Sequence, residues 1–213
     1  MTRFRIICRL IVNQLSSRFR FCIQTLGLIL VLWSFVGCNK YHNGFIEYKI
    51  PKGRHYSKGW RWGITSNPYR HITFQLDSTC LKNIQQGTDA WSKVSGFTVF
   101  HTHWNSCRVG WRVMNEKIQL GYYCYVGHKR IAGVLTETEP NAINQAECFW
   151  DKKTREYVVI INGHEKRIFQ PRGSLFYLYT YPFVGGRYRA NHEMKIWVKN
   201  HNPEAESLVR KIF

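Results

Sequence analysis

The chain alternates between apolar and polar residues over most of its length after residue 44. Short runs of period two, rich in β-branched and aromatic residues, are typical of half-buried strands. They are separated by turn residues at close spacing. The pattern predicts eleven strands near residues 45–50, 71–77, 95–103, 107–114, 117–125, 129–136, 146–150, 156–162, 165–170, 175–181 and 193–199.

Turn residues between these runs support the division into strands. Asn162-Gly163 is the strongest hairpin signal, because both residues tolerate positive φ. Helix is expected only near 88–93 and from about residue 204. Many short strands need two sheets that cover each other. The expected fold is all-β: an antiparallel β-sandwich over 45–200, jelly-roll-like or concanavalin-like.

One hairpin allows its register to be predicted. If Asn115 and Glu116 form a two-residue turn, residues whose numbers sum to 231 face each other, and Cys107 meets Cys124. One face of the pair is then apolar, and it carries Val109, Trp111, Val113, Ile118, Leu120 and Tyr122. The other face carries Arg108, Arg112, Gln119, Tyr123 and Tyr125, with Gly110 and Gly121 as gaps.

The cationic and phenolic face is a candidate binding surface. Arginine makes bidentate hydrogen bonds to carboxylates and sulfates, and tyrosine offers a flat apolar ring with a polar end. An ordinary exposed face, with arginine stems covering tyrosine rings, fits the same residues.

Four cysteines remain after residue 38, namely Cys80, Cys107, Cys124 and Cys148. The predicted register brings Cys107 and Cys124 to a non-hydrogen-bonded position, where the Cα atoms approach to about 4.5 Å, at the short end of disulfide geometry. A Cys107–Cys124 disulfide is therefore expected, with Cys80–Cys148 as the remaining pair. Two small buried thiols packed side by side are the alternative.

The N-terminal segment has the pattern of an export signal. An apolar stretch of eleven residues, Leu26 to Val36, follows five arginines, and the first acidic residue is Glu47. It is shorter than the roughly 20 residues of a membrane-spanning helix and suits the core of a signal peptide. An ordinary signal peptide, an uncleaved anchor or a buried strand would each fit this stretch.

The stretch SFVGC, ending at Cys38, resembles the lipobox of bacterial lipoproteins. The resemblance implies a helical signal peptide over 1–37, lipidation of Cys38, a tether over 38–44, and anchoring in a membrane of the bacterial cell envelope. Phe35 stands where the family has leucine. The sandwich would follow over 45–200, with a C-terminal tail over 201–213.

The net charge of the chain indicates which class of partner to expect. The chain has 31 basic and 13 acidic residues, a formal charge of +18. Removing the leader takes five arginines away and leaves a strongly basic domain, which attracts polyanions such as acidic glycans or lipid phosphates. Export makes nucleic acid an unexpected partner. A solvated basic surface without a ligand is the alternative. A monomer without cofactor is expected.

Three further stretches resemble small secreted bacterial β-sandwich proteins, many of them lipoproteins. They are IPKGRHYS (50–57), HTHWNSCRVGWR (101–112) and YTYPFVGGRYRANHEMKIWV (179–198). The resemblance implies the same fold class. It matches His103, Asn105, Ser106, Arg108, Gly110, Trp111, Arg112, Pro182, Gly185 and Gly186.

Catalytic patterns are sparse. His101 and His103 have a spacing that metal ions use, but no third ligand lies nearby in sequence, and no metal is expected. Sandwich polysaccharide lyases neutralise a uronate with Arg or Asn and move protons with Tyr or His. Those residue types occur here, without a lyase sequence signature. No carboxylate pair suggests a glycosidase, and there is no nucleophile elbow, phosphate loop or dinucleotide motif.

The sequence therefore predicts a membrane-anchored lipoprotein, with binding favoured over catalysis. Its β-sandwich would bind an anionic glycan or an envelope component. The expected contacts are Arg108, Arg112, Tyr123, Tyr125, His103 and Asn105. A lyase acting on uronate polymers and a structural envelope lipoprotein are the alternatives.

Lipidation of Cys38 has a direct test. Cells expressing the wild-type chain should incorporate labelled palmitate into it, and Cys38→Ser should abolish the label because the cysteine sulfur is the atom that carries the diacylglycerol. A label that is missing from the wild type, or equal in the two proteins, contradicts the lipidation.

Overall fold

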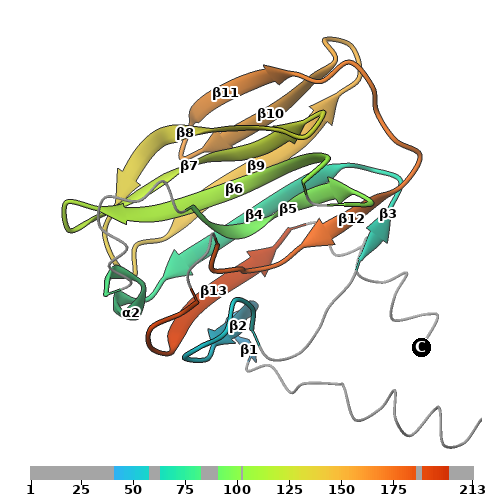
Figure 1. Ribbon diagram of the computed structural model, residues 1–213. Helices are drawn as coiled ribbons and strands as arrows, with labels where there is room; N and C mark the ends of the chain where they lie inside the picture. Colours follow the sequence, from blue (N-terminus) through green and yellow to red (C-terminus); the bar gives the residue numbers. More distant parts are fainter. Residues whose placement is uncertain (1–40, 58–62, 83–90, 102, 186–188, 202–213) are drawn as a thin grey trace, which may run out of the picture. The chain divides into compact units, whose positions relative to one another are not determined.

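Two antiparallel sheets form the framework of the molecule in the computed structural model (Figure 1). The structure describes residues 41–57, 63–82, 91–101, 103–185 and 189–201. The seven-stranded sheet has the order β1 (Tyr41–His42), β2 (Phe45–Ile50), β13 (Met194–Asn200), β4 (Tyr69–Leu76), β9 (Asn144–Asp151), β10 (Glu156–Ile161) and β11 (His164–Phe169). The six-stranded sheet has the order β3 (Ile64–Thr65), β12 (Tyr177–Thr180), β5 (Ser92–Val99), β6 (Asn105–Met114), β7 (Lys117–Val126) and β8 (Lys129–Thr138).

The chain passes repeatedly from one sheet to the other. Strand β13 lies between β2 and β4, and β12 lies between β3 and β5, so each sheet pairs strands that are distant in sequence. This is the jelly-roll way of covering one sheet with another. The predicted all-β, antiparallel sandwich is confirmed.

All eleven predicted strands are present, with ends that shift by a few residues. The short strands β1 and β3 and the one-turn helix α2 (Ser78–Leu81) were not predicted. The expected helix near 88–93 is wrong for Ser92 and Lys93, which begin β5, and its residues 88–90 lie outside the described part. Where a tether was expected, Tyr41–His42 pair with Phe45–Ile46 across an Asn43-Gly44 turn with positive φ at both residues.

The remaining N- and C-terminal predictions fall outside the described residues. These are the signal helix over 1–37, Cys38, and the tail after His201. In the part of the chain that is described, no helix is long and apolar enough to cross a membrane.

The core lies between the two sheets. Alternate side chains of the paired strands meet there, including Trp111, Leu120, Phe97 and Tyr157. Every member of the buried cluster among the described residues belongs to residues 46–198, so the segment 39–213 contains all of the core that the structure describes.

The β6–β7 hairpin has the predicted register. Asn115 and Glu116 both have positive φ, 51° and 61°, as a type I′ turn requires. Cys107 lies opposite Cys124, and Trp111 opposite Leu120. The apolar face is buried in the core, with Tyr122 partly buried against it.

The predicted disulfides are wrong, because all four described cysteines are free and buried. The Cys107 thiol points across the core and lies 3.9 Å from the carbonyl of Val158, while the Cys148 thiol lies 3.9 Å from the carbonyl of Cys107. Burial beside the thiols of Cys124 and Cys148 raises the pKa of Cys107 well above its usual value.

The thiol of Cys80 lies apart from the other three. Cys80 lies in α2, where its Sγ is 3.4 Å from the carbonyl of Lys195 in β13. Cys148, its expected partner, packs with Cys107 instead. Burial raises the pKa of Cys80 to about 12. The cysteines are therefore small buried thiols, as the alternative to the disulfides predicted.

Thiol titration tests this correction. Residues 39–213, purified without reductant, should show no thiol reactive toward Ellman's reagent in native buffer, because all four are buried. Four should react in guanidinium chloride. Two or fewer reactive thiols after unfolding would show that disulfides had formed.

Candidate binding face on the six-stranded sheet

The outer face of the six-stranded sheet carries the cations and phenols that the hairpin register places there. Arg108 and Tyr123 are cross-strand partners, and so are Arg112 and Gln119. The face is less open than the sequence suggests, because Arg108 and Tyr123 are buried while Arg112 and Tyr125 are partly exposed.

Trp91 closes the gap left by the two glycines. A Cβ atom at Gly110 would lie 3.0 Å from the indole of Trp91, and one at Gly121 would lie 2.8 Å from it. The indole therefore lies flat across the middle of the sheet, and only glycine at these two positions leaves room for it. The guanidinium of Arg112 lies 4.8 Å from the Trp91 ring centroid, on the more exposed side.

A second cover comes from the segment after β12. The backbone of Phe183 exchanges hydrogen bonds with Lys93, at 2.7 and 2.9 Å, and so extends the edge of the sheet locally. His55 stacks on the Phe183 ring at 5.4 Å and its Nδ1 lies 3.0 Å from the carbonyl oxygen of Val184. These contacts fix the segment beside β5, next to Lys93.

Lys93 is a further residue of this face, and the sequence pattern did not predict it. Its side chain is 5% exposed, and its Nζ donates a 2.7 Å hydrogen bond to the carbonyl of Trp91. The ammonium lies 4.0 Å from the centroid of Tyr123 and 5.6 Å from that of Phe183. A bulge in the pairing with β6 falls between Lys93 and Ser95, and it breaks the simple alternation along β5.

Arg108 lies beside the same ring. It is 6% exposed, and its guanidinium is 4.9 Å from the centroid of Tyr123 and 5.7 Å from that of Tyr125. Its stem crosses Gly96 on the neighbouring strand, where a Cβ would come within 2.8 Å of the Arg108 Cγ. The hydroxyl of Thr180, opposite Gly96, is buried without a hydrogen-bond partner among the described residues.

The crowding of positive charge changes the acid–base properties of the cluster. Burial, with the nearby charges of Arg108 and Arg130, lowers the pKa of Lys93 to about 7. Burial and the neighbouring charges, Arg108 foremost, lower the pKa of His103. Burial and the hydrogen bond to Tyr125 raise the pKa of Tyr123 to about 12. No carboxylate lies among the described contacts of Lys93, so the ammonium is compensated only by a carbonyl and ring faces.

A polar ladder neutralises one side of the face. The Arg112 Nε donates to the Gln119 side-chain oxygen at 3.0 Å, and the Gln119 amide donates to Glu137 at 3.2 Å. Glu137 also lies 3.3 Å from Lys117. Arg112 and Lys117 are therefore linked to a carboxylate, whereas no carboxylate lies among the described contacts of Lys93.

The loop before β6 borders this charged region. The ring of His103 lies 5.1 Å from that of Tyr125 and 5.5 Å from that of His101. Asn105, predicted to bind ligand, accepts a 2.9 Å hydrogen bond from the backbone N–H of Gly127, so it braces the β7–β8 turn. In the described part of the chain, no three His, Cys, Asp or Glu side chains are grouped to hold a metal ion.

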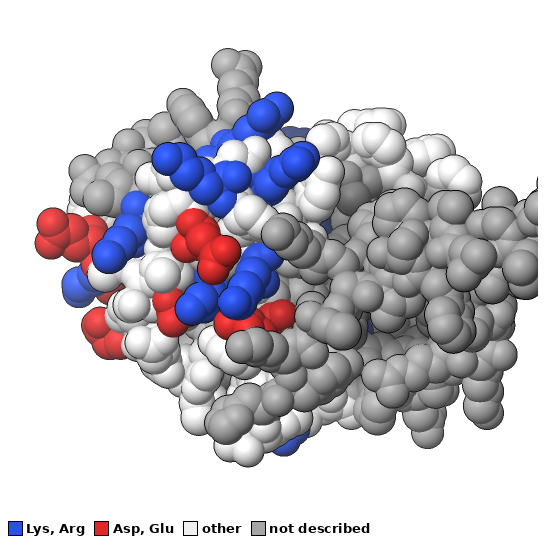
Figure 2. Space-filling model, turned by 90° about the horizontal axis from the view of Figure 1, so that it is seen from below, with Lys and Arg blue, Asp and Glu red and all other residues white. Residues whose placement is uncertain are grey.

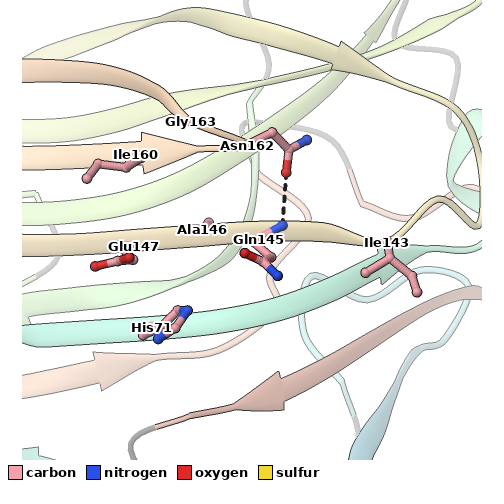
Figure 3. A pocket seen from close by; sticks show the side chains of 8 residues that line it. All are labelled: His71, Ile143, Gln145, Ala146, Glu147, Ile160, Asn162 and Gly163. Carbon is pink, nitrogen blue, oxygen red and sulfur yellow. Dashed lines mark hydrogen bonds between the residues drawn. The ribbon is translucent and has the colours of Figure 1, made fainter.

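Elsewhere the surface charges are mixed. Figure 2 shows one face on which lysines and arginines lie beside acidic side chains. A shallow pocket on the outer face of the seven-stranded sheet includes His71 and Glu147, which are cross-strand partners on β4 and β9 (Figure 3). Glu147 accepts a 2.7 Å hydrogen bond from the hydroxyl of Tyr69. The partly exposed carboxylate of Glu147 makes this pocket less suited to an anion than the outer face of the six-stranded sheet.

Comparison with known proteins shows only that this chain resembles other β-sandwich structures in fold. No model of a protein family matches the sequence, and no curated protein is similar to it in sequence. A polysaccharide lyase of family 18 is 8% identical, over 74% of this chain and 86% of that chain, with a TM-score of 0.46. A family 7 alginate lyase is 8% identical, over 75% and 82%, at 0.43, and a protein of unknown function from Saccharomyces cerevisiae is 9% identical, over 77% and 89%, at 0.44. Likenesses this weak carry no argument about activity.

The buried ammonium makes stability depend on pH. Between pH 7 and the usual lysine pKa near 10.4, the unfolded chain binds more protons at Lys93 than the folded chain, so the free energy of unfolding should rise with pH. We compare the free energy of unfolding of the wild type with that of Lys93→Met between pH 7 and about 8.5, where the cysteines of the unfolded chain are still mostly protonated. In this window the difference between the two proteins should change by up to about 1.4 kcal/mol per pH unit. Denaturant titrations of both proteins measure it, and parallel pH profiles would contradict the buried cation.

Proposed function

We propose that this protein binds an anionic glycan, or an anionic component of the cell envelope, on the outer face of its six-stranded sheet. The observation that supports it most is the buried ammonium of Lys93, which lies beside Arg108 with no carboxylate among its described contacts. Burying a charge without an opposite charge is costly. Buried ionisable groups with strongly shifted pKa values cluster at functional sites, and an anionic ligand would supply the opposite charge that Lys93 lacks.

The ligand would meet two kinds of groups. The partly exposed side chains of Arg112 and Tyr125, with exposed His103 and Arg130, make direct contacts. Lys93 and Arg108 lie beneath them and act through their field, which is weakly screened because both are buried. The buried hydroxyl of Thr180, without a described partner, adds a hydrogen-bonding group on the same row of the sheet.

Rings and cations together favour a sugar acid over a simple inorganic anion. Arginine pairs with carboxylate or sulfate, while Tyr125 and Trp104, which is half exposed, offer flat apolar surface to sugar rings. Lipidation at Cys38 would hold this face at a membrane of a bacterial envelope. What supports the anchor is the apolar stretch 26–36 followed by SFVGC.

A lyase is the second candidate, and one observation favours it. A lysine with a pKa of about 7 can act as a base near neutral pH, and Tyr123 keeps its proton up to about pH 12 and can act as an acid. In such a reaction Lys93 would take the proton from the carbon next to the uronate carboxylate. The electron pair would form a carbon–carbon double bond while the glycosidic bond breaks, and a proton from Tyr123 would go to the leaving oxygen.

Binding assays with alginate, polygalacturonate and hyaluronan, and neutral dextran as control, test the proposal. Arg112→Ala and Lys93→Met should each weaken binding to the preferred acidic polymer about tenfold or more, because the first removes a charge-assisted contact and the second removes a weakly screened positive charge beneath the ligand. Lys52→Met removes the same charge from an exposed turn and should leave affinity unchanged. Added salt should weaken wild-type binding.

The outcomes separate the candidates. Ultraviolet absorbance from an unsaturated uronate, lost in Lys93→Met, would show a lyase instead of a pure binding protein. Equal affinity of the wild type and both site variants for every polymer would show that this face is not the binding surface. Copurification with one envelope protein in the absence of any glycan binding would favour the structural role.

A further inference from the structure

Three large apolar side chains lie exposed at the connection between β11 and β12. Leu175 is 82% exposed, Phe176 65% and Phe169 62%. Figure 1 shows this connection running from the end of β11 toward β12, beside β3. Single exposed apolar residues are ordinary, whereas here three lie within eight positions of the chain, at and after the end of β11.

The connection is held by defined contacts. The Trp150 indole donates to the carbonyl of Gln170 at 3.1 Å, and the Gln170 amide donates to the carbonyl of Arg172 at 2.7 Å. Gly173 packs so closely on Trp150 that a Cβ would lie 2.2 Å from its ring. The backbone N–H of Ser174 donates to the hydroxyl of Tyr177 at 2.7 Å. The loop backbone is anchored to the sandwich while Leu175 and Phe176 remain outside.

Basic side chains lie in this connection and next to its start. The backbone N–H of Gln170 donates to the carbonyl of Arg155 at 2.8 Å, which places the β9–β10 turn beside the loop. Lys152, Lys153 and Arg155 are exposed in that turn, and Arg172 is exposed in the loop itself.

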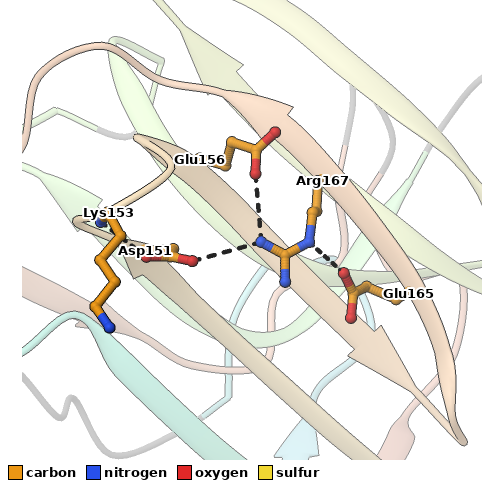
Figure 4. Close-up of polar contacts among 5 residues, drawn as sticks. All are labelled: Asp151, Lys153, Glu156, Glu165 and Arg167. Carbon is orange, nitrogen blue, oxygen red and sulfur yellow. Dashed lines mark hydrogen bonds and ion pairs between the residues drawn. The ribbon is translucent and has the colours of Figure 1, made fainter.

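The nearby acidic groups are already paired. Arg167 on β11 binds the carboxylates of Asp151, Glu156 and Glu165 (Figure 4). Asp151 also accepts the backbone N–H of Lys153 at 2.9 Å. One arginine therefore occupies three carboxylates, and the four bases of the turn and loop remain to attract an anionic surface.

We propose that this basic apolar tip, made of Phe169, Leu175 and Phe176 with the four bases, rests on an anionic lipid bilayer. The apolar side chains enter the interfacial region and the bases approach the lipid phosphates, a combination typical of peripheral membrane contact. Three such side chains offer well under the roughly 800 Å² per partner of a standard protein interface. That favours a membrane over a protein partner. The proposal is independent of the glycan-binding face.

Vesicle sedimentation with residues 39–213 tests it, since this segment is one compact unit with all of the described core and lacks Cys38 and the apolar stretch before it. The protein should pellet with phosphatidylcholine vesicles containing phosphatidylglycerol and much less with phosphatidylcholine alone. Leu175→Ser/Phe176→Ser should weaken binding at least tenfold. Lys152→Gln/Lys153→Gln should weaken vesicle binding on the order of fivefold for each base removed. Added salt should also weaken vesicle binding, because it screens the charges.

Ile143→Ser is the matched control, because Ile143 is 67% exposed away from the tip and should leave binding unchanged. Equal binding of the wild type and Leu175→Ser/Phe176→Ser would overturn the proposal, as would no binding to anionic vesicles. Concentration-dependent self-association, removed by Leu175→Ser/Phe176→Ser, would identify a second copy of the chain as the occupant and would also overturn it.

Discussion

The contact between the Lys93 ammonium and the Tyr123 ring constrains the whole outer face of the six-stranded sheet. A cation at 5% exposure needs rings, a carbonyl and closely fitted backbone around it. Gly185 supplies that fit, since a Cβ there would lie 2.3 Å from Lys93 Nζ and 2.0 Å from the Trp91 carbonyl oxygen. Gly96 does the same for Arg108. The small residues of this face make room for buried charge.

The inner and outer faces of the two sheets have different roles. Their inner faces form a core of interleaved aliphatic and aromatic side chains, which fixes the strands. The outer face of one sheet concentrates positive charge over tyrosine rings, while the outer face of the other has a shallow pocket with Glu147. The high net charge of the chain is therefore distributed unevenly, and the proposed functions depend on that distribution.

Local pattern was enough to predict the strands and one register. Positive φ at Asn115 and Glu116 fixes the β6–β7 pairing, and alternation then assigns Arg108 and Tyr123 to the outer face. The environment of that face depends on residues distant in sequence. Trp91 and Phe183 border it, and Lys93 lies in the stretch 88–93 for which a helix was predicted, directly before the bulge in β5. The thiols show the same limit, because Cys107 is oriented by Val158 on the opposite sheet.

The charge state of Lys93 tests the central claim most directly. Carbon-13 NMR of the lysine Cε, assigned by comparison with Lys93→Met, measures its pKa in the folded protein. We predict a pKa of about 7 in the free protein and a higher value with the preferred acidic polymer bound, because the ligand's carboxylates favour the ammonium. A pKa above 10 in the free protein, or one that stays the same in the saturated complex, would contradict it.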